Sequence, residues 1–258
     1  MSPFNPLKVL HSLLEPSYPA TEPTVSCVAI SNWRLDNGKN SRALLVQRPK
    51  FELEDLIDTA SRLLFSRLLF NSTSKHLLKL LAESYLTYEK HGQDELPNFH
   101  GLRDYYSLVK NLSQYNSLTP ENIQMALVRN FGGKGDIEEL IGKYFKSVMR
   151  NLSSTMEYSY KPIPILDLIN ANLEDKDARH LMVIGKSDSV VNLLNYQLRK
   201  KNLDPVVILG SQFPEDRDDY SYSVLNRIMM CVETGRILIL TDLEIIYGEF
   251  HLRVFFFF

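Results

Sequence analysis

The stretch Ser31-Asn32-Trp33-Arg34-Leu35-Asp36 lies between two apolar runs, and this arrangement decides our interpretation of the fold. Val25 to Ile30 form the first run, and Ala43 to Val46 form the second, directly after Arg42. Apolar runs of this length are typical of strands that are buried in a parallel sheet. The sequence therefore predicts two neighbouring parallel strands, with an asparagine and an arginine near strand ends, where α/β folds place their functional groups.

The overall composition is ordinary for a globular protein and favours neither a nucleic-acid nor a membrane partner. The chain has 258 residues, of which 44% are hydrophobic and 23% charged, and its formal net charge is −2. This length accommodates one large domain or two small ones. A nearly neutral chain produces no field that would attract nucleic acid or an anionic membrane. No apolar stretch approaches the ~20 residues that a transmembrane segment needs.

The cysteines and histidines do not have the spacing of metal ligands. Cys27 and Cys231 both lie in apolar surroundings, far apart in the sequence. No C-x₂-C or H-x₃-H pair is present, so the sequence predicts no zinc site and no RING domain. Two cysteines do not form a disulfide framework, and a reducing compartment fits this composition better.

Downstream of Pro49 the hydrophobic pattern changes from strands to helices. The best marked helix begins at Thr119-Pro120-Glu121, where a capping hydroxyl is followed by a proline and an acid in the first turn. Five helices are predicted in this region, and together they form an all-helical domain: residues 53–64, 76–90, 101–112, 119–131 and 137–148.

Pro162 and Pro164 mark a boundary, after which strands and helices alternate. The pattern predicts a helix from Lys186 to Lys200 and another that ends near Val232. It predicts three strands, at residues 180–184, 205–209 and 237–240. Strands that alternate with helices in this way indicate a parallel sheet.

Three patches of sequence resemble the mysterin-type family of giant AAA+ proteins, which carry a RING-type E3 ubiquitin ligase. They are SNWRLDNGKNSR at residues 31–42, HGLRDYYSLVK at residues 100–110 and CVETGRILILTDL at residues 231–243. The patches occur in the family's order, and the resemblance extends over residues 5–248. It implies a cytosolic, dynein-like ring of tandem AAA+ modules in one polypeptide, shaped by ATP binding.

On this resemblance the chain is an α/β protein with partial AAA+ (P-loop-type) core strands, an all-helical lid and a partial parallel-sheet module. The expected divisions run from the end of one AAA+ module into the start of a second, degenerate one. They are a loop-rich lead-in at 1–24, C-terminal core strands at 25–48, the lid at 49–160, the N-terminal half of the second module at 166–248, and an aberrant tail at 249–258.

The tail ends in four phenylalanines, Phe255 to Phe258, which would expose apolar rings at a terminus. We expect that the coding sequence stops there at an arbitrary point and that the chain is part of a longer protein. The alternative is a buried terminal strand.

The resemblance assigns nucleotide-related roles to three residues of the first module. Asn32 corresponds to the sensor 1 asparagine, whose amide orients the attacking water. Arg42 corresponds to an arginine finger that reaches a neighbouring module, with Arg48 as a rival. Arg103 corresponds to the sensor 2 arginine of the lid. The alternatives are a turn-capping asparagine, a solvated Arg42, and an Arg103 that is paired with Asp104 or solvated.

The phosphate-binding motifs of the second module are degenerate. Gly185-Lys186-Ser187 follows a predicted strand, but the first glycine of a G-x-x-x-x-G-K-[ST] loop would fall on His180. Asp242 lies where a Walker B aspartate would hold Mg²⁺, although Leu243 separates it from Glu244. The alternative is that these acids cap a helix or lie on the surface.

The resemblance implies ATP and Mg²⁺ as cofactors of the parent protein, whereas none is expected to bind this chain alone. Its implied partners are neighbouring AAA+ modules of the same polypeptide and the ubiquitin machinery. Because a Walker A loop, a regular Walker B motif and a RING are absent from the sequence, we expect this chain by itself neither to hydrolyse ATP nor to ligate ubiquitin. Two alternatives are a helical adaptor without catalysis and a P-loop enzyme that uses Gly185-Lys186-Ser187.

Overall fold

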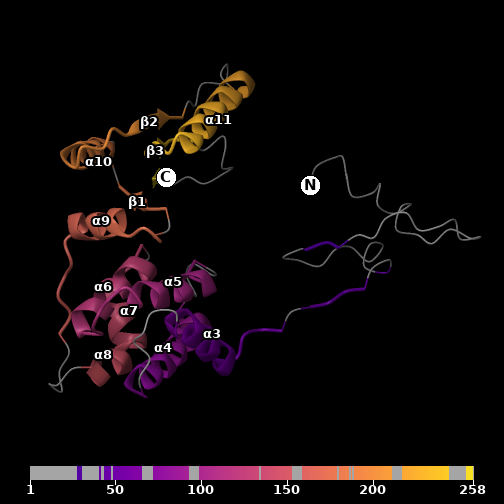
Figure 1. The fold of residues 1–258 in the computed structure, drawn as a ribbon, viewed down its shortest axis with the longest axis vertical. Helices are drawn as coiled ribbons and strands as arrows, with labels where there is room; N and C mark the ends of the chain where they lie inside the picture. The colour runs from indigo at the N-terminus through magenta and orange to yellow at the C-terminus, as the bar shows by residue number, and fades with distance from the viewer. Residues whose placement is uncertain are drawn as a thin grey trace, which may run out of the picture. The chain divides into compact units, whose positions relative to one another are not determined.

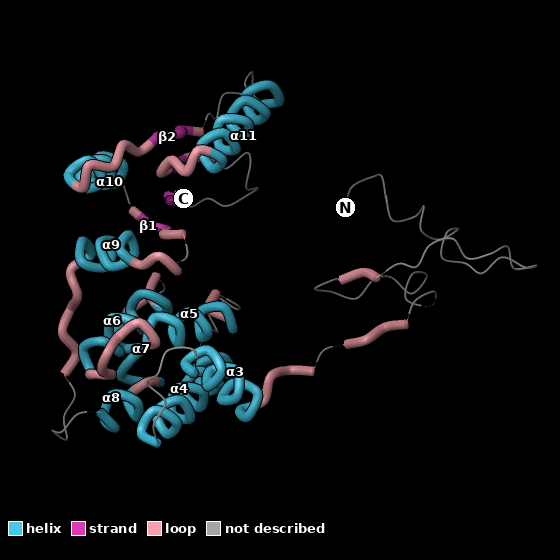
Figure 2. Tube along the Cα trace, viewed as in Figure 1, coloured by secondary structure: helices cyan, strands magenta, loops and turns pink. Residues whose placement is uncertain are grey.

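The fold is known for thirteen stretches of the chain. The computed structural model describes residues 28–30, 41, 44–47, 49–65, 72–92, 99–133, 135–152, 159–178, 180–185, 187, 189–210, 217–243 and 254–257. The chain divides into two compact units, Met1–Glu52 and Leu53–Phe258. Figure 1 shows the helices and strands along the chain, and Figure 2 shows them by type.

The predicted strand pair near the start is not confirmed. Residues 28–30 and 44–47 are not in strands, and their apolar side chains are exposed, including Val28 at 95% and Leu44 at 92%. Two parallel strands have no stable fold by themselves, because their faces are buried only when further strands and helices cover them. Asn32 and Arg42 lie outside the described residues.

Six helices form a bundle that begins directly after this unit. They are α3 (Leu53–Phe65), α4 (Ser72–His91), α5 (Leu102–Leu112), α6 (Pro120–Phe131), α7 (Ile137–Tyr144) and α8 (Lys146–Leu152). Each contributes buried residues to a common core. The largest side chains that are almost fully buried there include Tyr85, Tyr105, Phe131 and Phe145. All five predicted helices are therefore present, the fifth as two pieces.

The fifth predicted helix is divided at Phe145. This residue has φ −108° and ψ 10°, and its side chain is completely buried. Its ring lies 5.3 Å from the ring of Phe131, centroid to centroid. The change of direction allows α7 and α8 to pack on the same core, which a straight helix of this length would not do.

The helix starts agree with the capping chemistry of the sequence. Thr119 Oγ1 accepts a hydrogen bond from the backbone N–H of Asn122, and Pro120 occupies the first turn of α6. Asp136 caps α7 in the same way, by accepting from the backbone N–H groups of Glu138 and Glu139. Both caps satisfy amides that a helix cannot pair internally.

The rest of the second unit is an α/β fold. It consists of α9 (Ile165–Glu174), β1 (Met182–Ile184), α10 (Ser189–Lys200), β2 (Val206–Leu209), α11 (Arg217–Glu233), β3 (Leu238–Thr241) and β4 (Val254–Phe257). The three predicted strands and both predicted helices are confirmed. Helix α9 was not predicted, because the two prolines before it were interpreted only as a boundary.

The strands form one sheet in the order β1-β4-β3-β2. The pairing of β2 with β3 is parallel, as predicted. Strand β4 is antiparallel to both of its neighbours, so β1 runs in the same direction as β3 although the two do not touch. Residues 254–257 are therefore in a strand that pairs with both β1 and β3.

Helices cover both faces of this sheet. On one face, Leu238 and Leu240 of β3 share a core with Val224 and Cys231 of α11. On the other face, Ile239 shares a core with α9 and α10 through Ile169, Leu194 and Leu198. This alternation is the expected result when successive strand residues point to opposite faces. Within the described helices, none is both long and apolar enough to cross a membrane.

Candidate functional site

The two degenerate phosphate-binding motifs lie at the same edge of the sheet. Strands β1, β2 and β3 share one direction, so their carboxyl ends lie at the same edge. Gly185 follows β1, Gly210 follows β2 and Asp242 follows β3. Ligands of open α/β sheets bind at this edge. The structure therefore brings the two predicted parts of the second-module site to the edge where a ligand would bind.

The strand register places these two parts at the same height. Phe256 pairs with Met182 on one side and with Leu240 on the other. Two residues further along each strand, Ile184 is therefore level with Asp242. Strand β4 lies between them, so β1 and β3 are two strand spacings, or roughly 9–10 Å, apart.

The described residues that follow β1 pack closely against the start of α10. Helix α10 begins at Ser189, which leaves only residues 185–188 between strand and helix. A Cβ atom on Gly185 would collide with Cγ2 of Val190, so Gly185 lies tightly against the first turn of α10. Ser187 Oγ is 2.5 Å from Ser189 Oγ. Gly185 therefore has no room for a side chain beside the first turn of α10.

Asp242 adopts an unusual backbone conformation for a residue other than glycine, with φ 55°. Its carboxylate Oδ2 accepts a hydrogen bond of 3.0 Å from Thr241 Oγ1, and the Thr241 side chain is buried. The absence of a side chain at Gly210 is required here, because a Cβ atom at that position would collide with the backbone carbonyl of Asp242. Asp242, directly after β3, is therefore packed against Gly210 at the end of β2.

Arg103 lies in the first turn of α5 and is exposed to solvent. The Asp104 carboxylate turns back and accepts a hydrogen bond of 2.7 Å from the backbone N–H of Gly101. In the described part of the chain, no hydrogen bond or ion pair of the Arg103 side chain is found, including none with Asp104. The guanidinium is therefore available at the start of a helix that is fixed by its own cap.

His100 anchors this helix start to the rest of the bundle. Its Nε2 lies 3.0 Å from the backbone carbonyl of Gly132, and its Nδ1 lies 2.7 Å from the Tyr88 hydroxyl. A carbonyl only accepts, so Nε2 carries the proton and Nδ1 accepts from Tyr88. Burial, with a smaller contribution from Asp104, raises the pKa of Tyr88 to about 12, so its hydroxyl stays protonated. The sequence analysis did not find this role of His100, for which the only signal was a lone histidine before a helix start.

The remaining predicted site residues lie outside the part of the chain that the structure describes. They are Asn32, Arg42 and Lys186, together with the rival Arg48 and the second acid Glu244. Their predicted roles stay predictions. Among the residues that are described, no group of three or more histidine, cysteine or acidic side chains could hold a metal ion.

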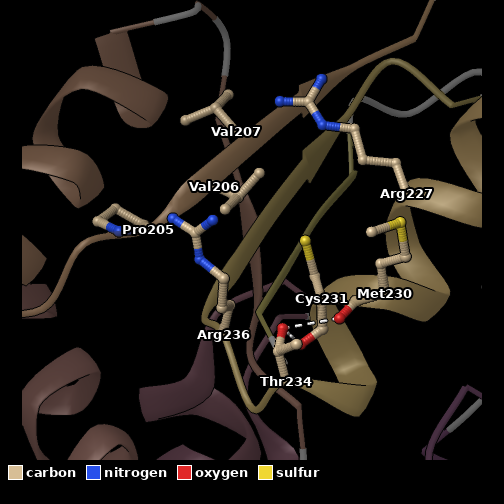
Figure 3. Close-up of a pocket in the computed structure, with 8 residues that line it drawn as sticks. All are labelled: Pro205, Val206, Val207, Arg227, Met230, Cys231, Thr234 and Arg236. Atoms are coloured by element: carbon tan, nitrogen blue, oxygen red, sulfur yellow. Dashed lines mark hydrogen bonds between the residues drawn. The ribbon is translucent and has the colours of Figure 1, made fainter.

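A cavity of about 540 Å³ lies at the opposite, amino-terminal edge of the sheet (Figure 3). It is bounded by the start of β2, by the second half of α11 and by Arg236, which precedes β3. Thr234 Oγ1 donates to the carbonyls of Met230 and Cys231, and Arg236 is paired with Asp204 at 3.3 Å. Because this cavity lies away from the carboxyl ends of the strands, it is not the predicted phosphate site.

Comparison with known proteins finds family matches toward both ends of the chain. One family profile, described as an RNF213 AAA domain, matches residues 170–251, and a second RNF213 AAA domain profile matches residues 1–55. The helical bundle lies between these two matches.

Three curated relatives align with almost the whole chain. The human E3 ubiquitin-protein ligase RNF213 is 32% identical over 268 residues, the mouse protein of that name is 32% identical over 273, and rnf213-beta of Danio rerio is 32% identical over 269. Each alignment covers 97% of this chain and 5% of the relative, so the chain spans about a twentieth of the relatives' length. The chain belongs to the mysterin-type, or RNF213, family and corresponds to a stretch that runs from one of its AAA domains into the next.

Proposed function

We propose that this chain acts as part of an AAA+ E3 ubiquitin ligase, in which it connects two consecutive AAA modules. One observation carries the proposal: two RNF213 AAA profiles match the ends of the chain, and a helical bundle lies between them. In this arrangement the bundle α3–α8 is the lid of the first module, and the segment α9–β3 opens the second. The relatives are named as E3 ubiquitin-protein ligases, which supports ubiquitin transfer as the activity of the whole protein.

In this proposal the lid contributes Arg103 to the nucleotide of the first module as a sensor 2 residue. Its exposure and its place at a rigidly capped helix start support the role. Asn32 would orient the attacking water, and Arg42 would act on the nucleotide of a neighbouring module. ATP and Mg²⁺ would belong to the whole protein, with none bound by this chain alone.

The second module would contribute structure rather than nucleotide chemistry. Two observations support this role: the first glycine of a G-x-x-x-x-G-K-[ST] loop is replaced by His180, and Gly185 packs closely against Val190. Lys186, Ser187 and Asp242 would then be remnants of a nucleotide site. The partners of the chain would be the neighbouring modules and, through the whole protein, the ubiquitin machinery, with the cytosol as the place of action.

The substitution Arg103→Ala in the full-length ligase tests the proposal. We expect ATP turnover to fall by about 10-fold or more, because a residue that contacts phosphate oxygens stabilises the charge that develops on them. The matched control is Lys110→Ala, which removes another exposed cation from the last turn of the same helix. Equal ATP turnover in the two variants would overturn the sensor 2 role of Arg103.

A helical adaptor without catalysis is the second candidate. The observation in its favour is the exposed apolar surface of α11, where Tyr222 is 71% exposed, Met230 66% and Met229 55%. Apolar side chains that are exposed together on one helix are typical of contact with another protein or domain. The adaptor alternative predicts that the Arg103→Ala ligase hydrolyses ATP normally.

A further inference from the structure

A buried carboxylate joins the helical bundle to the α/β part of the second unit. Asp175 follows directly after α9, and its side chain is 3% exposed. Its Oδ2 accepts from Asn111 Nδ2 and from Arg129 Nη2, both at 2.9 Å, and its Oδ1 accepts from Gln114 Nε2 at 2.7 Å. These three donors belong to α5, to the turn that follows α5, and to α6.

The same carboxylate also fixes the chain that leads into the sheet. Oδ1 accepts a second hydrogen bond, of 3.0 Å, from the backbone N–H of Asp177, and the backbone carbonyl of Asp175 accepts from Ala178. Each carboxylate oxygen therefore accepts two hydrogen bonds. The turn between α9 and β1 is consequently held by the same group that binds the bundle.

Helix α9 belongs to the α/β part through its apolar face. Ile169 is 3% exposed and shares a core with Leu194 and Leu198 of α10 and with Ile239 of β3. Its carboxyl end, in contrast, reaches the bundle through Asp175. The helix is thus fixed to the sheet by apolar packing and to the bundle by charged and polar contacts.

The donors around Asp175 are themselves held in place. Arg129 is only 9% exposed, and Asn111 Oδ1 accepts from Asn130 Nδ2 at 2.6 Å. A buried ion pair is a poor way to gain stability, because removing both charges from water costs about as much as their attraction returns. Its distinct property is geometric, since the four hydrogen bonds to the Asp175 carboxylate form together in only one relative arrangement of the elements that supply them.

We propose that Asp175 is a clasp that holds the helical bundle and the α/β part in one fixed orientation. A movement of the bundle is then transmitted to the sheet instead of being absorbed by the connecting segment around Pro162 and Pro164. The clasp acts within this chain and does not depend on the function proposed above or on any nucleotide.

Distance measurements between spin labels on the two parts test the clasp in this chain. We would introduce p-acetylphenylalanine at Lys146 of α8 and at Asn192 of α10 and couple a nitroxide spin label to each ketone. Both positions are exposed and take no part in the network. Pulsed electron–electron double resonance then gives the distribution of distances between the two spin labels. The variants are Asp175→Ala and the isosteric Asp175→Asn, with Glu174→Gln as the matched control because Glu174 is exposed and pairs with the half-buried Lys201 at 3.0 Å.

The clasp predicts one narrow distribution for the unsubstituted chain and for Glu174→Gln. It predicts a distribution at least twofold broader for both Asp175 variants. If Asp175→Ala fails to fold, Asp175→Asn decides the question, because it retains the size of the side chain. A broad distribution in the unsubstituted chain, or an unchanged width in Asp175→Asn, would overturn the proposal.

Discussion

At the scale of single residues, Asp175 and Arg129 form the ion pair in which the loss of one partner should matter most. Both are nearly excluded from solvent, at 3% and 9% exposure. By contrast, the ion pairs Arg62–Asp58 and Arg236–Asp204 are formed between exposed side chains and contribute at most about 1 kcal/mol each. Loss of one partner of a buried pair leaves an uncompensated charge inside the protein, which explains the difference.

The stability contributed by Asp175 should depend on pH in a defined direction. Burial alone would raise its pKa, but the hydrogen bonds from Gln114, Arg129 and the Asp177 backbone outweigh burial and hold the pKa below the ordinary value of 3.8. A carboxylate with a lowered pKa in the folded state stabilises above its unfolded pKa and loses that stabilisation as pH falls through the folded pKa. Asn111 and Asn172 also face this region but do not titrate.

We therefore expect Asp175→Ala to lower the free energy of unfolding at pH 7 by about 3–5 kcal/mol. The difference from the unsubstituted chain should shrink only below about pH 4, because the Asp175 carboxyl is protonated there first in the unfolded chain and at lower pH in the folded chain. Urea unfolding between pH 2.5 and 7 measures this difference, with Glu174→Gln as control. A difference that stays constant down to pH 2.5 would show that the charge of Asp175 is not involved.

At the scale of elements, the sequence predicted those helices and strands whose signals are local. Thr119 and Pro120 mark the start of α6 by chemistry that acts within four residues, and the structure has the helix there. No glycine or proline marks the division of α7 from α8 at Phe145 in the sequence. It follows from the burial of one ring against Phe131, which is a tertiary effect. Helix α9 was missed because prolines before a helix start and prolines in a linker look alike in sequence.

The cap of α6 gives a test at this scale. Thr119→Ala removes the acceptor for the Asn122 N–H and should lower the free energy of unfolding by about 1 kcal/mol. The nearby Ser117→Ala is a suitable control, because its exposed side chain is shortened while its backbone carbonyl still accepts from Asn122 Nδ2. Equal urea midpoints for the two variants would mean that the cap does not stabilise the helix.

At the scale of the whole molecule, contacts between residues far apart in the chain could not be predicted from the sequence. The clasp joins Asp175 to Asn111 and Arg129, which are 64 and 46 residues away in the chain. The insertion of β4 between β1 and β3 is a pairing of the same long-range kind. By contrast, the family resemblance predicted the order of the parts, because each of its motifs is local. The position of Arg103 at a helix start follows from the short run His100-Gly101-Leu102 in the same way.

The most direct test of the whole account is an electron cryomicroscopy structure of the full-length ligase with an ATP analogue and Mg²⁺. The account predicts the Arg103 guanidinium within hydrogen-bond distance of a phosphate oxygen in the first of the two modules. It also predicts no nucleotide at the carboxyl edge formed by Gly185 and Asp242. A nucleotide bound at that edge, with Arg103 directed into solvent, would contradict the assignment of the two modules.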